Sequence, residues 1–427
     1  MTVLLIIIFF LLMLMGIPIS LVLGMITVIY FFTVGNTALL DSTPMQLFSN
    51  LENYGLLAIP LFMLAGELMN GGGITSRLVR FARVLLGHVR GGLAYVAILS
   101  NMFLASILGS ANAQAAMMSK TLVPEMEKEY SRDFSSALTL SGSIIAPMLP
   151  PSMIFIIYGT QSGTSIGALF MAGIIPGLMY GLGFVLLIAF MGYKYNFPKN
   201  ERATIKQILN SAYSVIPALS IPVIILVGIL SGWFTPTESA AIACVIAFFI
   251  GKFFYKELTF RKLPAVFSNT VTSTATVTFL IAMAGAFGWM LTFEQIPQSI
   301  TNTMLSISEN TLLFLLLVNA LLLLLGAIID GIAALIILVP VFMPLLAVYE
   351  VDPIHFGVII CVNLTIGLLT PPVGTGLFIV SSIANIKFER LVVAMVPFLI
   401  VGILILLVIT YWEDTTLLIP RLMGLTQ

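Results

Sequence analysis

Two apolar segments interrupted by prolines constrain the fold of this chain more than any other feature. One reads Pro147-Met148-Leu149-Pro150-Pro151-Ser152 and the other reads Thr370-Pro371-Pro372-Val373-Gly374-Thr375-Gly376, and each lies in its own half of the sequence. A proline inside a helix removes a backbone hydrogen bond and frees a carbonyl group. Lipid tolerates such unpaired groups only where they are buried in protein or line a polar cavity. Two breaks at corresponding positions of the two halves are typical of a transporter's binding site.

The composition predicts an all-α polytopic membrane protein. Hydrophobic residues make up 59% of the chain and charged residues 8%, and the mean hydropathy is +1.13. Apolar stretches of about 20 residues recur, each long enough to cross hydrocarbon. The formal net charge is zero, so we expect no nucleic-acid partner. Cys244 and Cys361 both lie in apolar segments without metal-site spacing, which argues against a disulfide framework or a zinc site.

The hydrophobic pattern predicts a series of apolar segments joined by short polar loops. They lie at about 3–33, 55–70, 92–119, 135–159, 166–193, 212–231, 237–255, 267–292, 312–345, 355–383 and 392–412. The first has no charged start or cleavage site typical of a signal peptide. We expect it to stay in the membrane, split into two helices at Gly16-Ile17-Pro18. The Lys-rich loops 194–206 and 252–262 are expected in the cytoplasm by the positive-inside rule.

The two halves align with each other beyond the proline breaks. When the first half is shifted along the sequence by nearly the separation of the two breaks, Pro124 falls on Pro344 and Ser110 falls on Asp330. The same offset brings the amphipathic stretch 72–91 onto 293–311. The first stretch carries four arginines and the second contains no Lys or Arg, so the positive-inside rule places them at opposite faces of the membrane.

This charge difference is what an inverted-topology repeat predicts. We therefore expect a first repeat over residues 1–200 and a second over 207–427. Each repeat has an amphipathic arm, a long apolar stretch with a polar kink, and a broken helix. These lie at 72–91, 92–125 and 135–159 in the first repeat and at 293–311, 312–345 and 355–383 in the second.

The two kinked stretches are predicted to be re-entrant helical hairpins. Each half of such a stretch is shorter than the ~20 residues that cross a bilayer comfortably. The tips would lie at Gly109 to Asn112 and at Asp330-Gly331. Helix N-termini at a tip favour an anionic group, whereas carbonyl and hydroxyl oxygens favour a hard cation such as sodium. The two tips and the two breaks are expected to meet at one site.

Five motifs in this order resemble the large membrane subunit of tripartite ATP-independent periplasmic (TRAP) transporters. They are Pro150-Pro151-Ser152 with Tyr158-Gly159, the run from Phe234 to Ala241, Pro344, the run from Asp352 to Gly357, and Thr370-Pro371-Pro372-Val373-Gly374. The resemblance covers nearly the whole chain and suggests the sialic acid type. It implies sodium-coupled import of an organic acid across the bacterial inner membrane by an elevator mechanism.

The resemblance also implies partners and an architecture. The partners would be a small four-helix membrane subunit and a periplasmic substrate-binding protein, neither of which is expected within this sequence. The fold would resemble that of the divalent-anion/sodium symporters, with a scaffold and a moving transport domain joined by the arms 72–91 and 293–311. Sodium is the implied coupling ion, and no organic cofactor is expected. The anion itself stays open between sialic acid, C4-dicarboxylates, other sugar acids and keto acids, with a sugar acid preferred.

The candidate site residues come from the tips and the breaks. The predicted sodium-binding residues are Ser106, Gly109, Ser110, Asn112, Gly326, Asp330, Thr370 and Gly374. The predicted substrate-binding residues are Ser110, Ser152 and Thr375, framed by Pro150, Pro151, Pro371 and Pro372. An ionised carboxylate in a membrane segment is costly unless it is paired or bound to a cation, so Asp330 is the most informative acid. Its alternative role is a cap at the hairpin tip. The small residues could instead serve ordinary helix packing.

Other polar residues have structural interpretations. Thr235 and Glu238 have the spacing of a capping box, which we favour over ion binding. Glu67 is expected to contact another helix, the small subunit or the substrate. The arginines of 72–91 are expected to reach lipid headgroups, although one could form a salt bridge with a partner.

Three other classes of protein compete with this interpretation. An intramembrane enzyme is disfavoured because the two histidines, His88 and His355, form no HExxH motif. A channel usually places its broken helices around an oligomeric axis, whereas a repeat within one chain favours alternating access. A stand-alone sodium/dicarboxylate symporter is the main alternative, and independence from a binding protein would distinguish it.

Overall fold

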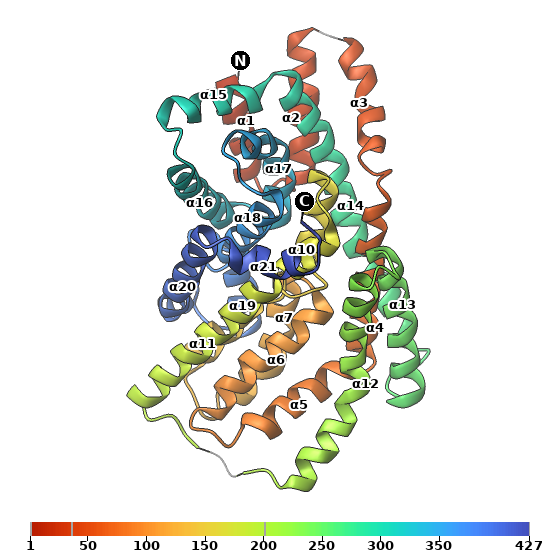
Figure 1. Cartoon of the computed structure of the whole chain (residues 1–427), viewed down its shortest axis with the longest axis vertical. Coiled ribbons are helices and arrows are strands. Elements are labelled where there is room, and N and C mark those ends of the chain that lie inside the picture. The colour runs from red at the N-terminus through yellow and green to blue at the C-terminus, as the bar shows by residue number, and fades with distance from the viewer. Residues whose placement is uncertain (1, 36, 200–201, 427) are drawn as a thin grey trace.

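The computed structural model describes residues 2–35, 37–199 and 202–426, and every regular element in these ranges is helical (Figure 1). In chain order the elements are α1 (Thr2–Leu14), α2 (Ile19–Val34), α3 (Thr37–Ser49), η1 (Tyr54–Leu57), α4 (Ala58–Gly71), α5 (Ile74–Leu86), α6 (Gly92–Leu108), α7 (Ala111–Met126), α8 (Arg132–Ser143), α9 (Met153–Ser162), α10 (Ile166–Ala172), α11 (Ile174–Lys194), α12 (Ile205–Leu230), α13 (Pro236–Phe249), η2 (Ile250–Phe254), α14 (Leu263–Phe293), α15 (Ile296–Ile307), α16 (Thr311–Ile328), α17 (Gly331–Val348), α18 (Pro353–Gly367), α19 (Thr375–Ile383), α20 (Phe388–Tyr411) and α21 (Asp414–Leu422).

The membrane-protein prediction is confirmed by the lengths of these helices. Within the described ranges, eight helical stretches are long and apolar enough to cross a bilayer. They are Tyr54–Gly71, Ile166–Lys194, Ile205–Leu230, Pro236–Phe254, Leu263–Phe293, Thr311–Ile328, Gly331–Val348 and Phe388–Tyr411. The predicted split of the first apolar segment is also confirmed, because α1 ends at Leu14 and α2 begins after Pro18.

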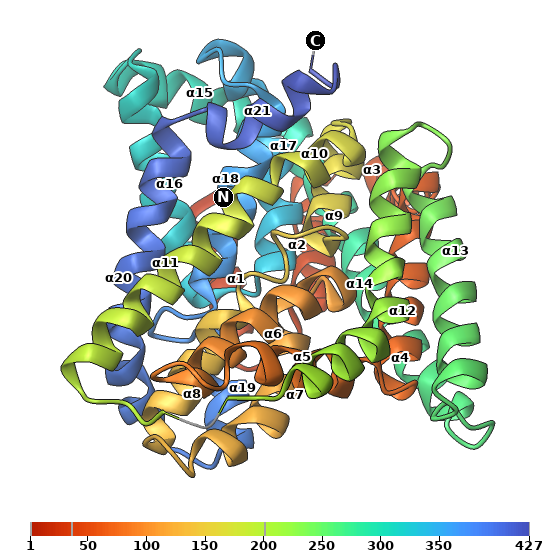
Figure 2. The same ribbon diagram turned by 60° about the horizontal axis from the view of Figure 1, so that its bottom comes forward.

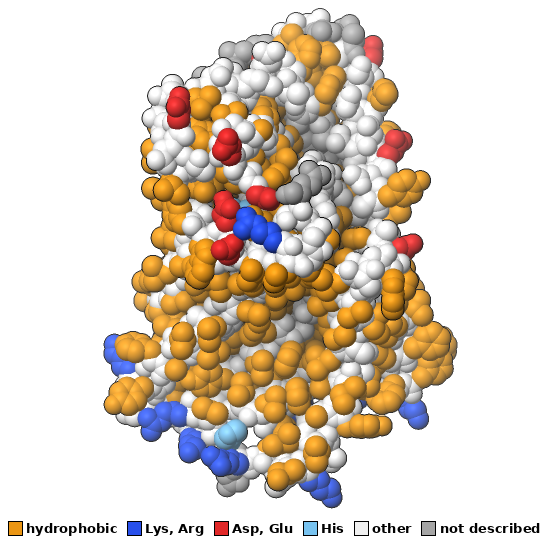
Figure 3. All heavy atoms as spheres, in the orientation of Figure 1, with side chains coloured by type: hydrophobic (Ala, Val, Ile, Leu, Met, Phe, Trp, Pro, Cys, Tyr) orange, Lys and Arg blue, Asp and Glu red, His pale blue; other side chains and the backbone are white. Residues whose placement is uncertain are grey.

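The two amphipathic stretches form short helices at opposite ends of the molecule. Helix α5 lies at the lower end of Figure 1 and α15 at the upper end, and the turned view in Figure 2 agrees. Each begins after a residue in the left-handed conformation, Gly73 with φ of 77° and Gln295 with φ of 54°. Figure 3 shows that most Lys and Arg side chains on this face gather at the lower end, and most Asp and Glu lie above them.

Two of the arginines in the first amphipathic stretch contact protein, which corrects the expectation that they reach headgroups. Arg77 Nη1 donates to Glu257 Oε1 at 2.6 Å, and its guanidinium lies 3.9 Å from the centre of the Tyr255 ring. Arg83 pairs with Glu125 at 3.2 Å. A partly exposed ion pair contributes only about 0.2–1 kcal/mol, so these contacts orient α5 more than they stabilise it.

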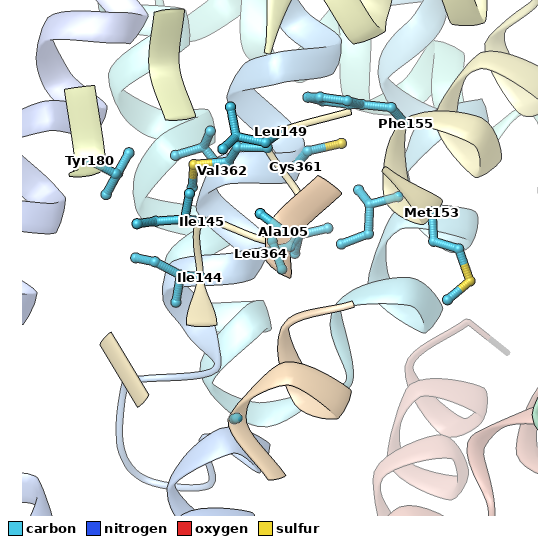
Figure 4. Packing of buried hydrophobic residues seen from close by; sticks show 14 of the residues in the cluster. Ala105, Ile144, Ile145, Leu149, Met153, Phe155, Tyr180, Cys361, Val362 and Leu364 are labelled. Atoms are coloured by element: carbon cyan, nitrogen blue, oxygen red, sulfur yellow. The ribbon is translucent and has the colours of Figure 1, made fainter. Parts of the chain in front are cut away.

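The core is centred on the first proline break and on α18. Figure 4 shows Ile145 and Leu149 from this break beside Cys361 and Val362 of α18, all of them buried. Tyr158 of α9 donates its hydroxyl to the carbonyl of Pro353 at 2.7 Å. The broken segment of one half therefore packs directly on the corresponding segment of the other half.

Three polar side chains hold helices in place, as their sequence context indicated. Thr235 Oγ1 accepts from the backbone N–H of Glu238, and Glu238 Oε2 accepts from that of Thr235, which confirms the capping box. Asn269 of α14 donates to Glu67 of α4 at 3.3 Å. Glu67 therefore contacts another helix of the same chain, one of the roles considered for it.

Candidate functional site

The first polar kink is a tight turn between α6 and α7. Gly109 caps α6 with a φ of 57°, and the Ser110 hydroxyl accepts from the N–H of Ala113 at the start of α7. A side chain at Gly109 would not fit, because its Cβ would lie 2.7 Å from the carbonyl oxygen of Pro151. The Gly109 carbonyl in turn accepts from the N–H of Met153 at 3.4 Å. The turn is thus held against the first proline break.

The second polar kink joins α16 and α17 at Asp330. This residue is the N-cap of α17, and its Oδ1 accepts from the N–H of Ile332 at 3.0 Å. Its side chain is partly buried. In the part of the chain that the structure describes, no Lys, Arg or His forms an ion pair with Asp330. A carboxylate in this setting is available to a cation that comes from outside the protein.

The first proline break is closed by side-chain and backbone contacts at the start of α9. The peptide bond between Pro150 and Pro151 is cis. The fully buried Ser152 hydroxyl donates to the carbonyl of Pro147 and accepts from the N–H of Phe155. Both hydrogen-bonding directions of this hydroxyl are used within the break.

The second proline break is held against the second kink. The peptide bond between Pro371 and Pro372 is cis, and Gly374 has a φ of 53°. The N–H groups of Val373 and Gly374 both donate to the carbonyl of Ala327 at 3.1 Å. Each kink therefore hydrogen-bonds to the break of its own half.

A small cavity of about 30 Å³ lies where the two kinks meet. Its walls come from both kinks, from the first break and from α18. They comprise Gly109, Ser110, Ala111, Asn112, Pro147, Met153, Ile154, Asp330, Gly331, Ile332, Leu364 and Leu368. Figure 4 shows Met153 and Leu364 from two of these walls. The N-termini of α7 and α17 both lie at this cavity and give it a partly positive lining, and the Asp330 carboxylate caps the second of them.

The size of the cavity determines what it can hold in this conformation. A cavity needs about 10–15 Å³ to hold one water molecule, and a small-molecule pocket usually measures about 300–1,000 Å³. The cavity is thus large enough for water or a monatomic ion and too small for an organic acid. Carbonyl, hydroxyl, amide and carboxylate oxygens are the ligands that hard cations prefer.

The structure brings together four of the predicted site residues and leaves the others nearby. Gly109, Ser110, Asn112 and Asp330 line the cavity. Thr375 reaches it indirectly, because its hydroxyl lies 3.4 Å from the Asn112 amide across the two halves. The residues that do not line it are Ser106, Pro150, Pro151, Ser152, Gly326, Thr370, Pro371, Pro372 and Gly374. Pro147 lines the cavity, whereas the residues predicted from the same break were Pro150, Pro151 and Ser152.

Gly326 occupies a packing position. It faces Gly367 of α18, and a Cβ on Gly367 would lie 2.4 Å from the Gly326 carbonyl carbon. The backbones of α16 and α18 therefore approach closely, as small residues allow in membranes. This contact sets the position of the Asp330 kink relative to the second break.

We expect Gly367→Ala to destabilise the protein by about 1–3 kcal/mol, because the added methyl group meets backbone that cannot rotate away. Gly288→Ala on α14 is the matched control, since its Cβ would find only Pro340 Cγ at 3.7 Å. Alanine is the better helix former by about 1 kcal/mol, so the control should be neutral or slightly stabilised. Thermal unfolding of the two purified variants measures the difference, and equal midpoints would refute the packing role.

Two buried polar pairs support the kinks and were not predicted as a set. Gln114 of α7 donates to the side-chain oxygen of Asn101 on α6 at 2.7 Å. Asn363 of α18 donates to Asn319 of α16 at 2.6 Å, and Asn319 donates to Thr410 of α20 at 3.0 Å. Each amide interrupts an apolar run, which is the signal that could have identified them. Asn319 thus links α16 to both α18 and α20.

Comparison with known families identifies the chain. The family model of the tripartite ATP-independent periplasmic transporter, DctM component, matches residues 6–415. The chain belongs to the TRAP large permease family. As the sequence predicted, it is a multi-pass protein of the bacterial inner membrane, and its relatives are transporter permeases rather than enzymes.

This TRAP permease has relatives with several different substrates in their names. It is 38% identical to the sialic acid TRAP transporter large permease SiaM of Vibrio cholerae, over 92% of each chain. It is 39% identical to the 2,3-diketo-L-gulonate permease YiaN of Escherichia coli, over 86% of this chain and 87% of that one. It is 36% identical to the C4-dicarboxylate permease DctM of Pseudomonas aeruginosa, over 90% of each.

A solved structure shares the fold of this permease. The YdaH transporter of Alcanivorax borkumensis superposes with a TM-score of 0.63 over 88% of each chain, at 13% identity. This likeness shows the fold alone.

Proposed function

We propose that this permease imports an organic acid across the inner membrane by sodium-coupled symport. Its relatives in the TRAP family are named for sialic acid, 2,3-diketo-L-gulonate and C4-dicarboxylates, which are all carboxylates. Two of these three are sugar acids, in line with the preference drawn from the sequence. The single observation that carries the proposal is the cavity shared by the Ser110 and Asp330 kinks.

Sodium is the ion that fits this cavity by size and ligand chemistry. Oxygen ligands are offered by Ser110, Asn112 and Asp330, and carbonyls freed at the breaks could complete the shell. The other residues proposed for sodium, which are Ser106, Gly326, Thr370 and Gly374, would then support the site from the surrounding turns. Asp330 has no internal cation partner within the described residues, so a bound sodium ion would balance its charge.

The organic acid would bind beside the sodium after the tips separate. Among the described residues, no Lys or Arg lines the cavity, so the substrate carboxylate would be held by helix N-termini, hydroxyl groups and sodium itself. Ser110, Ser152 and Thr375 are the proposed contacts, framed by the proline pairs. Ser152 can take part only if its bond to Pro147 opens.

An inverted repeat accounts for the arrangement of the two halves. Residues 1–200 contain α5, the α6–α7 pair and the interrupted α8–α9 pair, in the same order as α15, α16–α17 and α18–α19 in residues 207–427. Helices α5 and α15 lie at opposite ends of the molecule (Figure 1), and the basic end carries α5. This placement supports opposite membrane orientations of the two halves.

The two kinked pairs are proposed to be re-entrant hairpins of a moving transport domain. Helix α5 is fixed to the loop at Glu257 by Arg77, while Arg83 contacts Glu125 at the end of α7. A short helix anchored at one end and bonded to the hairpin at the other is suited to act as a hinge arm. An elevator movement of the hairpins against the remaining helices would carry the site across the membrane.

The proposed partners are those of the family. A small four-helix membrane subunit would widen and stiffen the scaffold, and a periplasmic binding protein would deliver the anion. Specificity would then rest largely with the binding protein, which explains why the permease site itself contains few selective groups.

Uptake into proteoliposomes tests the proposal. The permease is reconstituted with its small subunit, and labelled sialic acid, a C4-dicarboxylate and a keto acid are offered with and without an inward sodium gradient and the binding protein. We expect uptake of one of these acids that needs both sodium and the binding protein. Uptake that needs sodium alone would favour the stand-alone symporter, and uptake that needs neither would contradict the sodium site.

A further inference from the structure

A second cavity lies apart from the site of the two kinks. It has a volume of about 230 Å³ and lies between α1, α2 and α14 on one side and α16 and α17 on the other. Side chains such as Leu5, Phe9, Met290, Leu325 and Ala334 form its walls. In Figure 1 these helices cluster in the upper part of the molecule, below α15. Nothing in the proposed transport cycle uses this cavity.

The lining of this cavity excludes water and polar ligands. Its walls are almost wholly apolar, and the polar side chains that line it are Tyr30 and Glu294. These two are hydrogen-bonded to each other. A buried water molecule needs two to four polar partners, and away from this pair the walls supply none. Empty apolar space also costs the wall atoms their dispersion contacts, so a hydrocarbon occupant is favoured.

The lining of the cavity includes residues near the start of the amphipathic α15 and at the turn between α16 and α17. Glu294 and Ile296 lie where α14 meets α15, and Ile329 lies next to Asp330. Phe10 of α1 lines the cavity and is 42% exposed on the apolar outer surface. A chain anchored at the level of α15 could therefore reach inward along α17 from the surrounding bilayer.

The charges around the entrance favour one kind of headgroup. All residues that line the cavity belong to the segments 1–76 and 263–386, and neither segment contains a Lys or Arg. An anionic lipid would therefore find no cationic partner among the described residues that line the cavity. Glu294 is exposed at this end, and its carboxylate can accept a hydrogen bond from a primary ammonium group.

We propose that this cavity binds one acyl chain of a phospholipid with a primary ammonium headgroup, such as phosphatidylethanolamine. The chain fills the space between α1, α2 and α14 and the α16–α17 pair, and the ammonium group lies at Glu294. The site is separate from the sodium cavity and lies where the α16–α17 pair, which the proposed function has moving, meets α1, α2 and α14. It fills the gap behind the Asp330 kink with a molecule that the membrane itself supplies.

Ala334 offers the sharpest test of this site. It lines the cavity and is buried, so Ala334→Phe fills the space that the acyl chain would take. Ala347→Phe lies on the same helix at an exposed position and is the matched control. The purified complex with its small subunit is delipidated, titrated with phosphatidylethanolamine or with phosphatidylglycerol of the same chains, and examined by native mass spectrometry.

We expect wild-type protein and Ala347→Phe to retain one more phosphatidylethanolamine molecule per complex than Ala334→Phe, and to prefer it over phosphatidylglycerol. Ala334→Leu is a smaller change and should lower lipid retention partly. It keeps the site testable if the phenylalanine variant does not fold. Glu294→Gln keeps the bond to Tyr30 and should remove the headgroup preference without loss of the bound chain. Equal retention by Ala334→Phe and wild type would overturn the site, and equal retention of both lipids by wild type would overturn the headgroup assignment.

Discussion

Replacement of Asp330 by Ala should reduce sodium-dependent uptake by at least 10-fold. Even an outer-shell partner of a metal site is worth roughly 10–100-fold in affinity, and Asp330 is proposed as a direct ligand at the cavity of the two kinks. The loss should appear as a raised sodium concentration for half-maximal uptake in proteoliposomes. Folded protein should still be recovered, because the loss of an N-cap typically costs only ~1 kcal/mol.

A second substitution at the same position separates the charge of Asp330 from its capping role. Asp330→Asn retains a side-chain oxygen that can accept from the N–H of Ile332, yet it removes the negative charge. If the charge holds sodium, the asparagine variant should be nearly as impaired as the alanine variant. If Asp330 is only a cap, Asp330→Asn should behave like wild type.

Asp352 provides the matched control for this pair of variants. It caps α18 in the same way, with Oδ1 accepting from the N–H of Ile354 at 2.7 Å, and it does not line the cavity. Asp352→Asn should therefore leave the sodium dependence of uptake unchanged. A shift equal to that of Asp330→Asn would show that the assay reports general helix capping and not the ion site.

Replacement of Gly109 by Ala should abolish most uptake, with a loss of 10-fold or more. The added Cβ would lie 2.7 Å from the carbonyl oxygen of Pro151 and 3.3 Å from the amide nitrogen of Met153. The first kink must then move away from the break that holds it. A displacement of about 1 Å at a positioned site can cost roughly 100-fold in rate. Initial uptake rates at saturating sodium, normalised to the amount of folded permease, measure this effect.

Gly163 controls for the backbone conformation alone. It has a φ of 71°, and a Cβ there would meet nothing within 4 Å. Gly163→Ala therefore carries the left-handed strain of roughly 1–2 kcal/mol without a collision. The difference between the two variants isolates the contact between the kink and the break. Similar losses in both would attribute the defect to strain and would remove the kink from the proposed site.

The sequence predicted the parts of the fold that depend on hydrophobicity and local breaks. The length of the apolar stretches identified long helices such as α12 and α20. Pro18 marked the point at which the first apolar segment divides into α1 and α2. The capping box at Thr235 followed from residue spacing, because its contacts are only three residues apart. Such features are encoded within a single turn or a single span of the chain.

Other helices were missed because their sequence carries no comparable signal. Helix α3 contains Pro44 and a mixture of polar and apolar residues, and α21 follows the last apolar segment at the polar end of the chain. The length argument for the second hairpin was also wrong. Helices α16 and α17 each hold 18 residues, or roughly 27 Å, so length alone does not exclude that they cross the bilayer.

The site was predicted in outline, and its exact members depend on packing between distant segments. Ser110 and Asp330 could be paired from the repeat, and the structure places both at one cavity. The contact between Gly326 and Gly367 could not be predicted, since it depends on the crossing of α16 and α18. The bond from Arg77 to Glu257 likewise joins residues far apart in the chain. Sequence alone left Gly326 open between an ion site and helix packing, and it assigned no role to Gly367 or Glu257.

Simultaneous measurement of sodium and substrate movement tests the central claim most directly. Proteoliposomes containing the permease, its small subunit and the binding protein loaded with its acid receive radioactive sodium outside, and both labels are followed in time. The account predicts that sodium enters together with the organic acid in a fixed ratio, and that Asp330→Asn reduces both fluxes alike. Accumulation of the acid without any accompanying sodium flux would contradict the account.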